Sequence, residues 1–92
     1  MLVDTVVYEI DLSATGEVVA LWREAAAGGG IYTSHLREEG LGLFEGVGEA
    51  IRIGREARIP IVLTHHKAIG KAMWGQSVRT LAMVDSARAA GI

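Results

Sequence analysis

The chain has 92 residues, half of them apolar, and a formal net charge of −2, which excludes a disordered chain and leaves no basic patch for nucleic acid. It contains no cysteine, which excludes disulfide bonds and thiolate metal ligands. Met1–Asp4 lacks the basic start of a signal peptide, and no apolar run approaches the ~20 residues that span a bilayer, so we expect a cytoplasmic protein with no membrane partner.

The first third of the chain contains a strand-like stretch and a predicted helix. Residues 2–10 mix β-forming side chains and are compatible with a strand. Ser13 or Thr15 offers an N-cap for the helix, and Gly28–Gly30 ends it, because glycine adopts a left-handed conformation without a Cβ penalty. Apolar residues recur at helical intervals between these limits, at Val18, Val19, Leu21, Trp22, Ala25 and Ala26.

A strand, a helix and a second strand follow. Residues 30–35 and 59–65 read as strands, and residues 41–58 carry an apolar stripe of helical period. A crossover of this length joins two parallel neighbouring strands with a right-handed connection. The sequence therefore predicts an α/β protein with a βαβ unit at its centre.

The last part of the chain predicts a loop and a helix. Residues 69–75 form the loop, Ser77 caps the helix and Gly91 ends it. A further strand would begin at Ile92. Trp74 suits either the mouth of a pocket or an apolar contact with the last helix.

Each strand of the βαβ unit ends in a histidine, His35 in the first and His65 in the second. Parallel neighbouring strands lie ~4.8 Å apart, and imidazole nitrogen binds zinc at about 2.0–2.1 Å, so two such rings can share an ion. Spacing alone leaves solvated strand-end histidines as the competing interpretation. Alternation along each strand predicts that two sets of side chains face the same side of the sheet, namely Ile31, Thr33 and His35, and Ile61, Leu63 and His65.

Three stretches stand out together: Tyr32–Gly40 (YTSHLREEG), Glu49–Ile51 with Ile53–Ala57 (EAI and IGREA), and Ile59–Lys67 (IPIVLTHHK). As a block they resemble the middle of the N-acyl-D-amino-acid deacylases, the D-aminoacylases of the amidohydrolase superfamily. His65 follows His35 by 30 residues, the interval between that family's two barrel histidines. The resemblance runs from about Thr15 to Ile92 and is densest over residues 29–74.

This resemblance implies a fragment of a (β/α)₈ barrel, because a whole barrel takes about 250 residues. The chain would supply about strands five and six with their helices. We therefore expect residues 1–92 to form a partial amidohydrolase barrel domain. Residues 1–14 are a poorly matched lead-in, and residues 15–92 are the βα units.

The resemblance also implies a function, the hydrolysis of an N-acyl-D-amino acid to a D-amino acid and a carboxylate. His35 and His65 would be zinc ligands, and zinc would polarise the scissile carbonyl. The family's cysteine ligand and its catalytic aspartate have no counterpart here, so no catalytic residue lies within this chain and the isolated chain should be inactive. Its partners would be the small-molecule substrate and either the rest of the barrel or another copy bound through strand edges.

Four charged residues and a third histidine complete the candidate site. Lys67 and Arg37 are the predicted substrate-binding residues, since the family associates a lysine at this motif position with the substrate carboxylate. Glu38 and Glu39 are predicted to be a solvated acidic pair. His66 has the opposite parity to His65 and is predicted to be structural.

Three alternatives stay open on the sequence. One is a cyclic amidohydrolase of the dihydroorotase or hydantoinase type. Another is a truncated fragment with no catalysis of its own. The third is a dinucleotide-binding turn at Gly40–Gly46, which fits poorly because four residues separate it from the strand and its third glycine is one place late.

Overall fold

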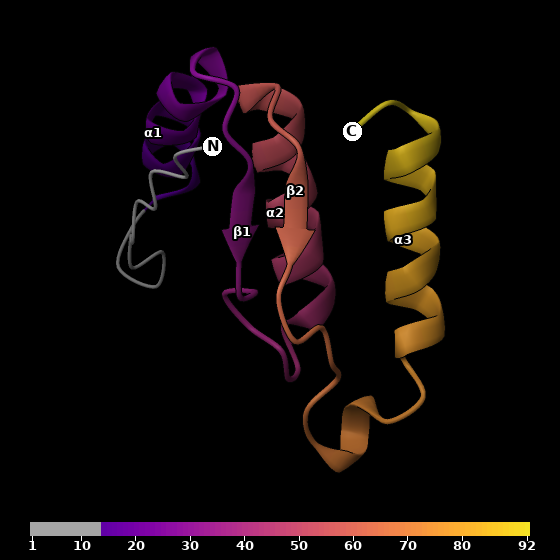
Figure 1. The fold of residues 1–92 in the computed structure, drawn as a ribbon. Coiled ribbons are helices and arrows are strands. Elements are labelled where there is room, and N and C mark those ends of the chain that lie inside the picture. The colour runs from indigo at the N-terminus through magenta and orange to yellow at the C-terminus, as the bar shows by residue number, and fades with distance from the viewer. Residues whose placement is uncertain (1–13) are drawn as a thin grey trace.

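The computed structural model describes residues 14–92, so the predicted strand at residues 2–10 and most of the lead-in lie outside the described residues. The elements run in the order predicted, and Figure 1 shows them in chain order. They are the helix α1 (Thr15–Ala27), the strand β1 (Tyr32–Ser34), the helix α2 (Leu43–Ala57), the strand β2 (Ile61–Leu63), the 3₁₀ helix η2 (Lys71–Met73) and the helix α3 (Ser77–Ala89). The predicted α/β class is confirmed. No helix within residues 14–92 is long and apolar enough to cross a membrane.

β1 and β2 are parallel neighbours, with Tyr32 opposite Ile61 and Ser34 opposite Leu63. Within residues 14–92, α1 and α2 cover one face of this pair, and no helix or strand covers the other, open face (Figure 1). On the open face, Ile31 is 50% exposed and Val62 is 48% exposed. The βαβ unit is therefore present as predicted, with strands shorter than the predicted residues 30–35 and 59–65.

The register corrects one prediction about the strand faces. Thr33 lies opposite Val62, so the open face carries Val62 and not Ile61 or Leu63. Ile61 and Leu63 instead pack with the clusters on the helical side. The prediction assumed that side chains alternate between the two faces all the way to His65. β2 ends at Leu63 and the chain turns before His65, so the alternation does not extend that far.

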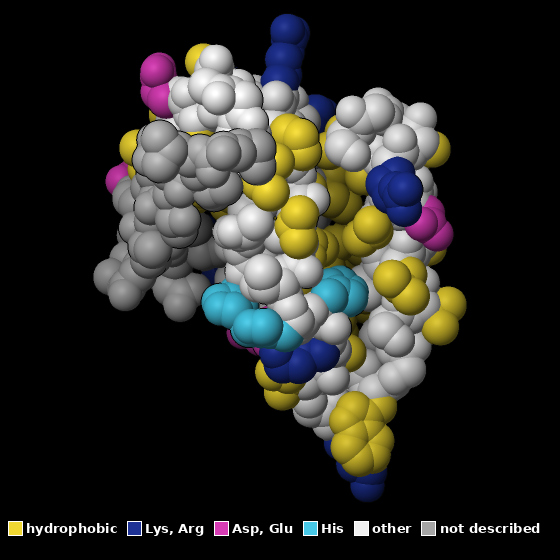
Figure 2. All heavy atoms as spheres, in the orientation of Figure 1, with side chains coloured by type: hydrophobic (Ala, Val, Ile, Leu, Met, Phe, Trp, Pro, Cys, Tyr) yellow, Lys and Arg dark blue, Asp and Glu magenta, His cyan; other side chains and the backbone are white. Residues whose placement is uncertain are grey.

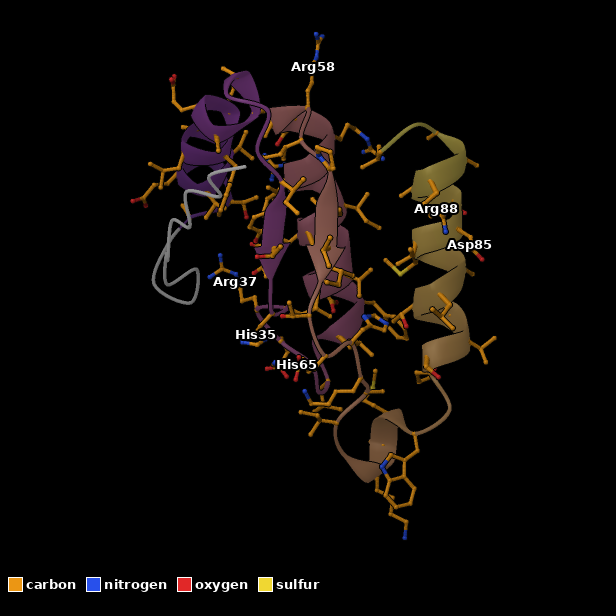
Figure 3. All side chains as sticks on the ribbon, in the orientation of Figure 1. His35, Arg37, Arg58, His65, Asp85 and Arg88 are labelled. Atoms are coloured by element: carbon orange, nitrogen blue, oxygen red, sulfur yellow. The ribbon has the colours of Figure 1, made fainter. Side chains whose placement is uncertain are left out.

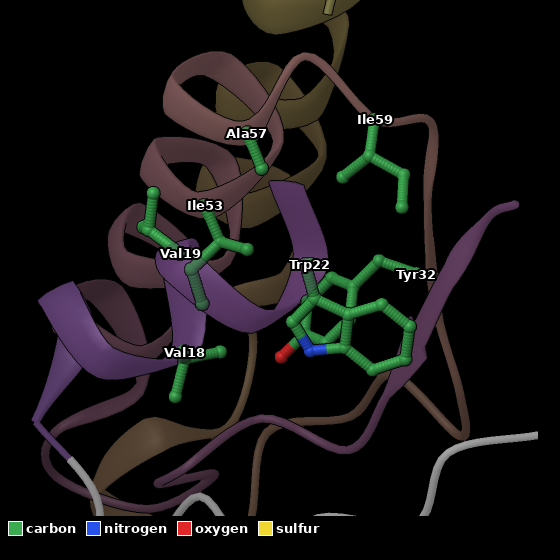
Figure 4. Packing of buried hydrophobic residues seen from close by; sticks show 7 residues of the cluster. All are labelled: Val18, Val19, Trp22, Tyr32, Ile53, Ala57 and Ile59. Atoms are coloured by element: carbon green, nitrogen blue, oxygen red, sulfur yellow. The ribbon is translucent and has the colours of Figure 1, made fainter. Parts of the chain in front are cut away.

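The larger core joins α1, α2 and the two strands. Trp22 and Tyr32 lie at its centre with ring centroids 4.8 Å apart (Figure 4). Burial raises the pKa of the Tyr32 phenol above its ordinary value, so this hydroxyl stays neutral in the core. The buried members of the cluster are Val18, Val19, Trp22, Tyr32, Ile53, Ala57 and Ile59.

A second core lies under the loops that follow the strands. Leu36 comes directly after His35 and packs against α2, and Met73 of η2 is a further buried member of this cluster. The other buried members are Leu43, Val47 and Ala50. This core holds the loop after β1 against the start of α2 and so fixes where His35 lies.

The helix ends differ from those predicted in two respects. α1 has Ala14 at its N-cap position and α3 has Gln76, and neither helix has a side-chain cap hydrogen bond. Thr15 and Ser77 are the first helical residues instead. The hydroxyl of Thr15 donates to Glu49 of α2, so a contact between two helices replaces the predicted local cap.

α3 stands apart from β2, and a groove of about 900 Å³ separates them. Ile61 and Leu63 line one wall, and Leu81 and Val84 of α3 line the other. The groove extends to Ile92. Val78 and Leu81 of α3 are 76% and 54% exposed, so the apolar residues predicted along this helix are largely uncovered within the described part of the chain.

Replacing either of two glycines of α2 by alanine is expected to change the stability of the fold, in opposite directions. A Cβ at Gly46 would lie 2.7 Å from the backbone oxygen of Glu38, whereas a Cβ at Gly48 would meet nothing within 4 Å. We expect Gly46→Ala to lower the free energy of unfolding by about 1–3 kcal/mol, because the loop after β1 must move. Gly48→Ala should raise it by about 0.5–1 kcal/mol, because it removes a flexible residue from a helix interior. Urea unfolding of the two variants measures both, and equal effects would contradict the close packing of the loop on α2.

Candidate metal centre

His35 and His65 lie side by side where the two strands end. Their ring centroids are 4.0 Å apart, and the ring planes are tilted by 36°. His35 follows β1 directly and His65 lies two residues beyond β2. Figure 3 shows both side chains at the end of the sheet to which the strand arrows point in Figure 1. The predicted juxtaposition of these two rings is confirmed.

A turn after β2 brings His65 to this position. The backbone N–H of Thr64 donates to the carbonyl of Ser34 at 2.9 Å, which adds one further parallel hydrogen bond after the strand. The chain then turns, and His65 adopts a left-handed conformation with φ 34°. A non-glycine residue in this region carries a cost of order 1–3 kcal/mol, and such residues concentrate at functional sites.

A small hollow of about 310 Å³ lies beside the two rings, and Lys67 lines it. The Lys67 ammonium is 3.0 Å from a carboxylate oxygen of Glu39 and 3.3 Å from the carbonyl oxygen of His65. The loop between β1 and α2 supplies the opposite wall of the hollow, so both βα loops contribute to it. Figure 2 shows histidine and lysine or arginine side chains gathered below the strands on the same face of the molecule.

The chain is similar to three curated proteins of Alcaligenes xylosoxydans xylosoxydans. It is 39% identical over 77 residues to a D-aminoacylase and 46% identical over 76 residues to an N-acyl-D-glutamate deacylase. An N-acyl-D-aspartate deacylase is 41% identical over 61 residues. The first two matches cover 84% and 83% of this chain and 16% of each relative, so the chain spans about one sixth of their length. No family model matches the chain.

Solved structures agree with the sequence comparison. A crystal structure of a D-aminoacylase superposes with a TM-score of 0.79 over 83% of this chain and 16% of the solved chain, at 39% identity. An N-acyl-D-glutamate deacylase from Bordetella bronchiseptica superposes with a TM-score of 0.84 over 87% of this chain and 17% of that one, at 38% identity. The chain resembles an internal segment of the N-acyl-D-amino-acid deacylases. The resemblance seen in the sequence is thereby confirmed.

The deacylase structures contain metals. The Bordetella protein was crystallised with zinc and a phosphonate inhibitor, and a D-aminoacylase is described as having a binuclear metal center. Within residues 14–92 of this chain, no group of three or more histidine, cysteine or acidic residues is placed to hold an ion. His35 and His65 therefore fit two positions of a zinc site that needs about four donors.

His66 does not join the pair. Its Nε2 lies 2.8 Å from the hydroxyl of Thr80 in α3, and that hydroxyl donates to the carbonyl of Ser77. Its Nδ1 is buried without a hydrogen-bond partner within the described residues. His66 points to the helical side of the sheet, which agrees with the structural role predicted for it.

Arg37 forms an ion pair with α2. Its Nε lies 3.0 Å from both carboxylate oxygens of Glu49, and Thr15 donates to the same carboxylate at 2.7 Å. This network joins the start of α1, the middle of α2 and the loop that follows His35. A substrate contact by Arg37, the role predicted from the sequence, stays a prediction beside this observed ion pair.

Of the acidic pair after β1, Glu38 is exposed as predicted, whereas the side chain of Glu39 is mostly buried. Glu39 pairs with Lys67, and a carboxylate oxygen of Glu38 accepts the backbone N–H of Gly40 at 2.6 Å. A Cβ at Gly42 would lie 2.6 Å from the Glu38 side chain. This glycine turn is therefore filled by the chain's own carboxylate, and the structure gives no support to a dinucleotide site.

Sequence reasoning missed Thr64 and Glu49 as members of the site. Thr64 has the pattern of an ordinary strand residue, although its place one residue before His65 is visible in the sequence. Glu49 is visible as the one acid in the resembling stretch Glu49–Ile51. Nothing local in the sequence indicates that it binds Arg37, 12 residues earlier.

Glu49→Gln tests the network around Arg37. The Glu49 side chain is 15% exposed, and Glu49→Gln removes the negative charge that pairs with the Arg37 guanidinium. We expect a loss of about 1–3 kcal/mol in the free energy of unfolding. Glu56→Gln is the matched control, because Glu56 lies on the same helix in an exposed pair with Arg52 and should change stability by less than about 0.5 kcal/mol. Equal losses in the two variants would contradict a special role for Glu49.

Proposed function

We propose that this chain supplies part of the active site of a metal-dependent hydrolase that cleaves the amide bond of N-acyl-D-amino acids. The products are a D-amino acid and a carboxylate. The observation that carries the proposal is the pair of imidazoles, 4.0 Å apart at the carboxyl ends of two parallel strands. It occurs in a segment that is 39–46% identical to two deacylases.

Zinc is the metal that we propose for this site, and His35 and His65 would be two of its ligands. Neutral imidazole is a common zinc donor, and two donors on adjacent parallel strands suit one ion. When bound, the metal polarises the scissile carbonyl. The other ligands and the proton-transferring residue are proposed to lie outside residues 14–92.

Lys67 is proposed to bind the substrate carboxylate. Its ammonium lines the same hollow as the two rings and already pairs with a carboxylate, that of Glu39. A substrate carboxylate in the hollow would compete with Glu39 or share the ammonium with it. Arg37 lines the other side of the hollow and is proposed to assist.

The wider setting is proposed to be a (β/α)₈ barrel, in which β1 and β2 would be about strands five and six. Support comes from the parallel register and from the helices of residues 14–92, which cover one face of the sheet and leave the other for a barrel interior. Two of the relatives are named for N-acyl-D-glutamate and N-acyl-D-aspartate, which favours a deacylase over a cyclic amidohydrolase.

A chimera tests the proposed function. Residues 15–92 would replace the matching segment of the Alcaligenes N-acyl-D-glutamate deacylase, to which the chain is 46% identical. We expect zinc-dependent hydrolysis of an N-acyl-D-glutamate. His35→Ala or His65→Ala in the chimera should each lower kcat/KM on the order of 10³-fold, as expected for members of one catalytic unit.

His66→Ala is the matched control in the chimera, because His66 contacts α3 and not the other rings. It should leave the bound zinc unchanged and act on stability. A folded chimera that binds zinc and has no hydrolase activity would contradict the proposed function. Full activity in His35→Ala would contradict it as well.

A further inference from the structure

Glu39, in the loop after β1, binds the loop after β2 at two points. Its carboxylate oxygen lies 3.0 Å from the Lys67 ammonium, and its backbone carbonyl accepts the N–H of Ile69 at 2.8 Å. All three residues line the hollow beside the two imidazoles. One residue therefore joins the two loops of the candidate site, next to the side chain proposed to bind the substrate.

We propose that Glu39 is the positioning residue for Lys67, and this inference rests on the proposed deacylase function. The Glu39 carboxylate holds the ammonium in the hollow, so the substrate carboxylate binds a lysine that is already in place. A lysine side chain loses rotamer freedom when it binds an anion, and a lysine that an ion pair has already ordered loses less. Glu39 thus raises the affinity for substrate without touching it.

The geometry favours an ammonium shared by two carboxylates over displacement of Glu39. An ammonium has three N–H donors. Within residues 14–92, one lies 3.0 Å from the Glu39 carboxylate and one lies 3.3 Å from the His65 carbonyl, which leaves the third for an acceptor in the hollow. The Lys67 side chain is 47% exposed, so a ligand can reach it, whereas the Glu39 side chain is 14% exposed.

The residues on both sides hold Glu39 in place. Leu36, three residues earlier, is buried in the second core. The Glu38 carboxylate accepts the backbone N–H of Gly40 at 2.6 Å, which closes the turn around Glu39. A lysine ammonium sits on a flexible four-carbon stem. The anchored carboxylate therefore sets the position of the Lys67 ammonium, and not the reverse.

Steady-state kinetics of the deacylase chimera on an N-acyl-D-glutamate test the proposal. Glu39→Ala should raise KM about tenfold, the factor for a hydrogen bond to a charged group, and change kcat less than about threefold, because binding and not chemistry is affected. Glu39→Gln keeps an acceptor at the same length and should bring KM to within about threefold of the wild-type value. Glu45→Ala is the matched control. It removes the same charge from an exposed residue at the start of α2 that does not line the hollow, and it should change neither constant.

Reductive methylation of lysine, followed by peptide mass spectrometry of the chimera, measures the contact independently of activity. Lys67 and Lys71 are the two lysines of this chain, and the exposed Lys71 is the internal reference. We expect Lys67 to react several times more slowly than Lys71. This difference should disappear in Glu39→Ala and persist in part in Glu39→Gln.

A KM that falls in Glu39→Ala would overturn the proposal, since it would show that Glu39 competes with the substrate. An unchanged KM, an equal rise in Glu39→Gln, or a wild-type Lys67 as reactive as Lys71 would overturn it as well. A folded chimera that protects Lys67 and has no hydrolase activity would overturn the proposed function and leave the Glu39 contact standing. Glu39→Asp replaces Glu39→Ala if the alanine variant does not fold, and it should also raise KM, because its shorter side chain draws the ammonium out of place.

Discussion

The purified 92-residue chain is expected to show no hydrolysis of N-acetyl-D-methionine, even with zinc present. The reason is the composition of the site. Residues 14–92 bring together two imidazoles and no third histidine, cysteine or acidic ligand, and a zinc ion held by two side chains is bound weakly. Removing one member of a catalytic unit can by itself cost several orders of magnitude in rate, and residues 14–92 group no third metal ligand with the two imidazoles.

The assay needs the chimera as its positive control, with the same substrate class and the same zinc concentration. Amine release would be followed with and without a chelator. Turnover by the isolated chain that His35→Ala abolishes would show that the chain contains a complete active site. That result would contradict the expectation that its catalytic residues lie outside it.

The isolated chain is also expected to associate with itself or to lack a cooperative melt. Within residues 14–92 the sheet has two strands, so each strand is paired on one side only. Exposed strand edges recruit other chains, and the open face adds Ile31 and Val62, each about half exposed. The groove of about 900 Å³ beside β2 leaves further apolar surface uncovered. Light scattering over a concentration series, together with a thermal melt, measures both outcomes.

Val62→Lys provides the specific test of association through the sheet. A charge on the open face of β2 should shift the population toward the monomer. Val78→Lys makes the same change on α3, where Val78 is 76% exposed, and should have a smaller effect. A stable monomer with a cooperative melt in the wild type would favour a small autonomous α/β domain over part of a barrel.

The sequence predicted the order of the elements because each carries its own local signal. The apolar stripe of α2 is a local signal, and so are the β-branched residues Ile61 and Val62 with Pro60 before them. The boundaries were less accurate, since a three-residue strand ends where its partner ends. The residues predicted as β by propensity at 30, 31 and 35 have no ladder partner in the observed sheet.

For the candidate site, too, the sequence predicted some features correctly and others wrongly. The spacing of His35 and His65 around one crossover was sufficient to predict that their rings would meet, because parallel topology brings strand ends together. The faces of Ile61 and Leu63 were predicted wrongly, because counting by twos assumes a strand that continues to His65. His65 lies in a left-handed turn, so its ring lies beside the His35 ring although Ile61 and Leu63 face the helices.

The sequence by itself thus determined the α/β order, the parallel βαβ unit and the meeting of two imidazoles at one end of the sheet. Only the tertiary structure decided which side chains lie around those rings: the Thr64 hydroxyl, 2.9 Å from Nδ1 of His35, and Glu49, which binds Arg37 in the loop that follows. These partners are 29 and 12 residues apart in the chain. The physical reason is that periodicity and propensity act over a few neighbouring residues. A hydrogen bond between elements depends instead on how helices and strands pack, and no local pattern encodes that packing.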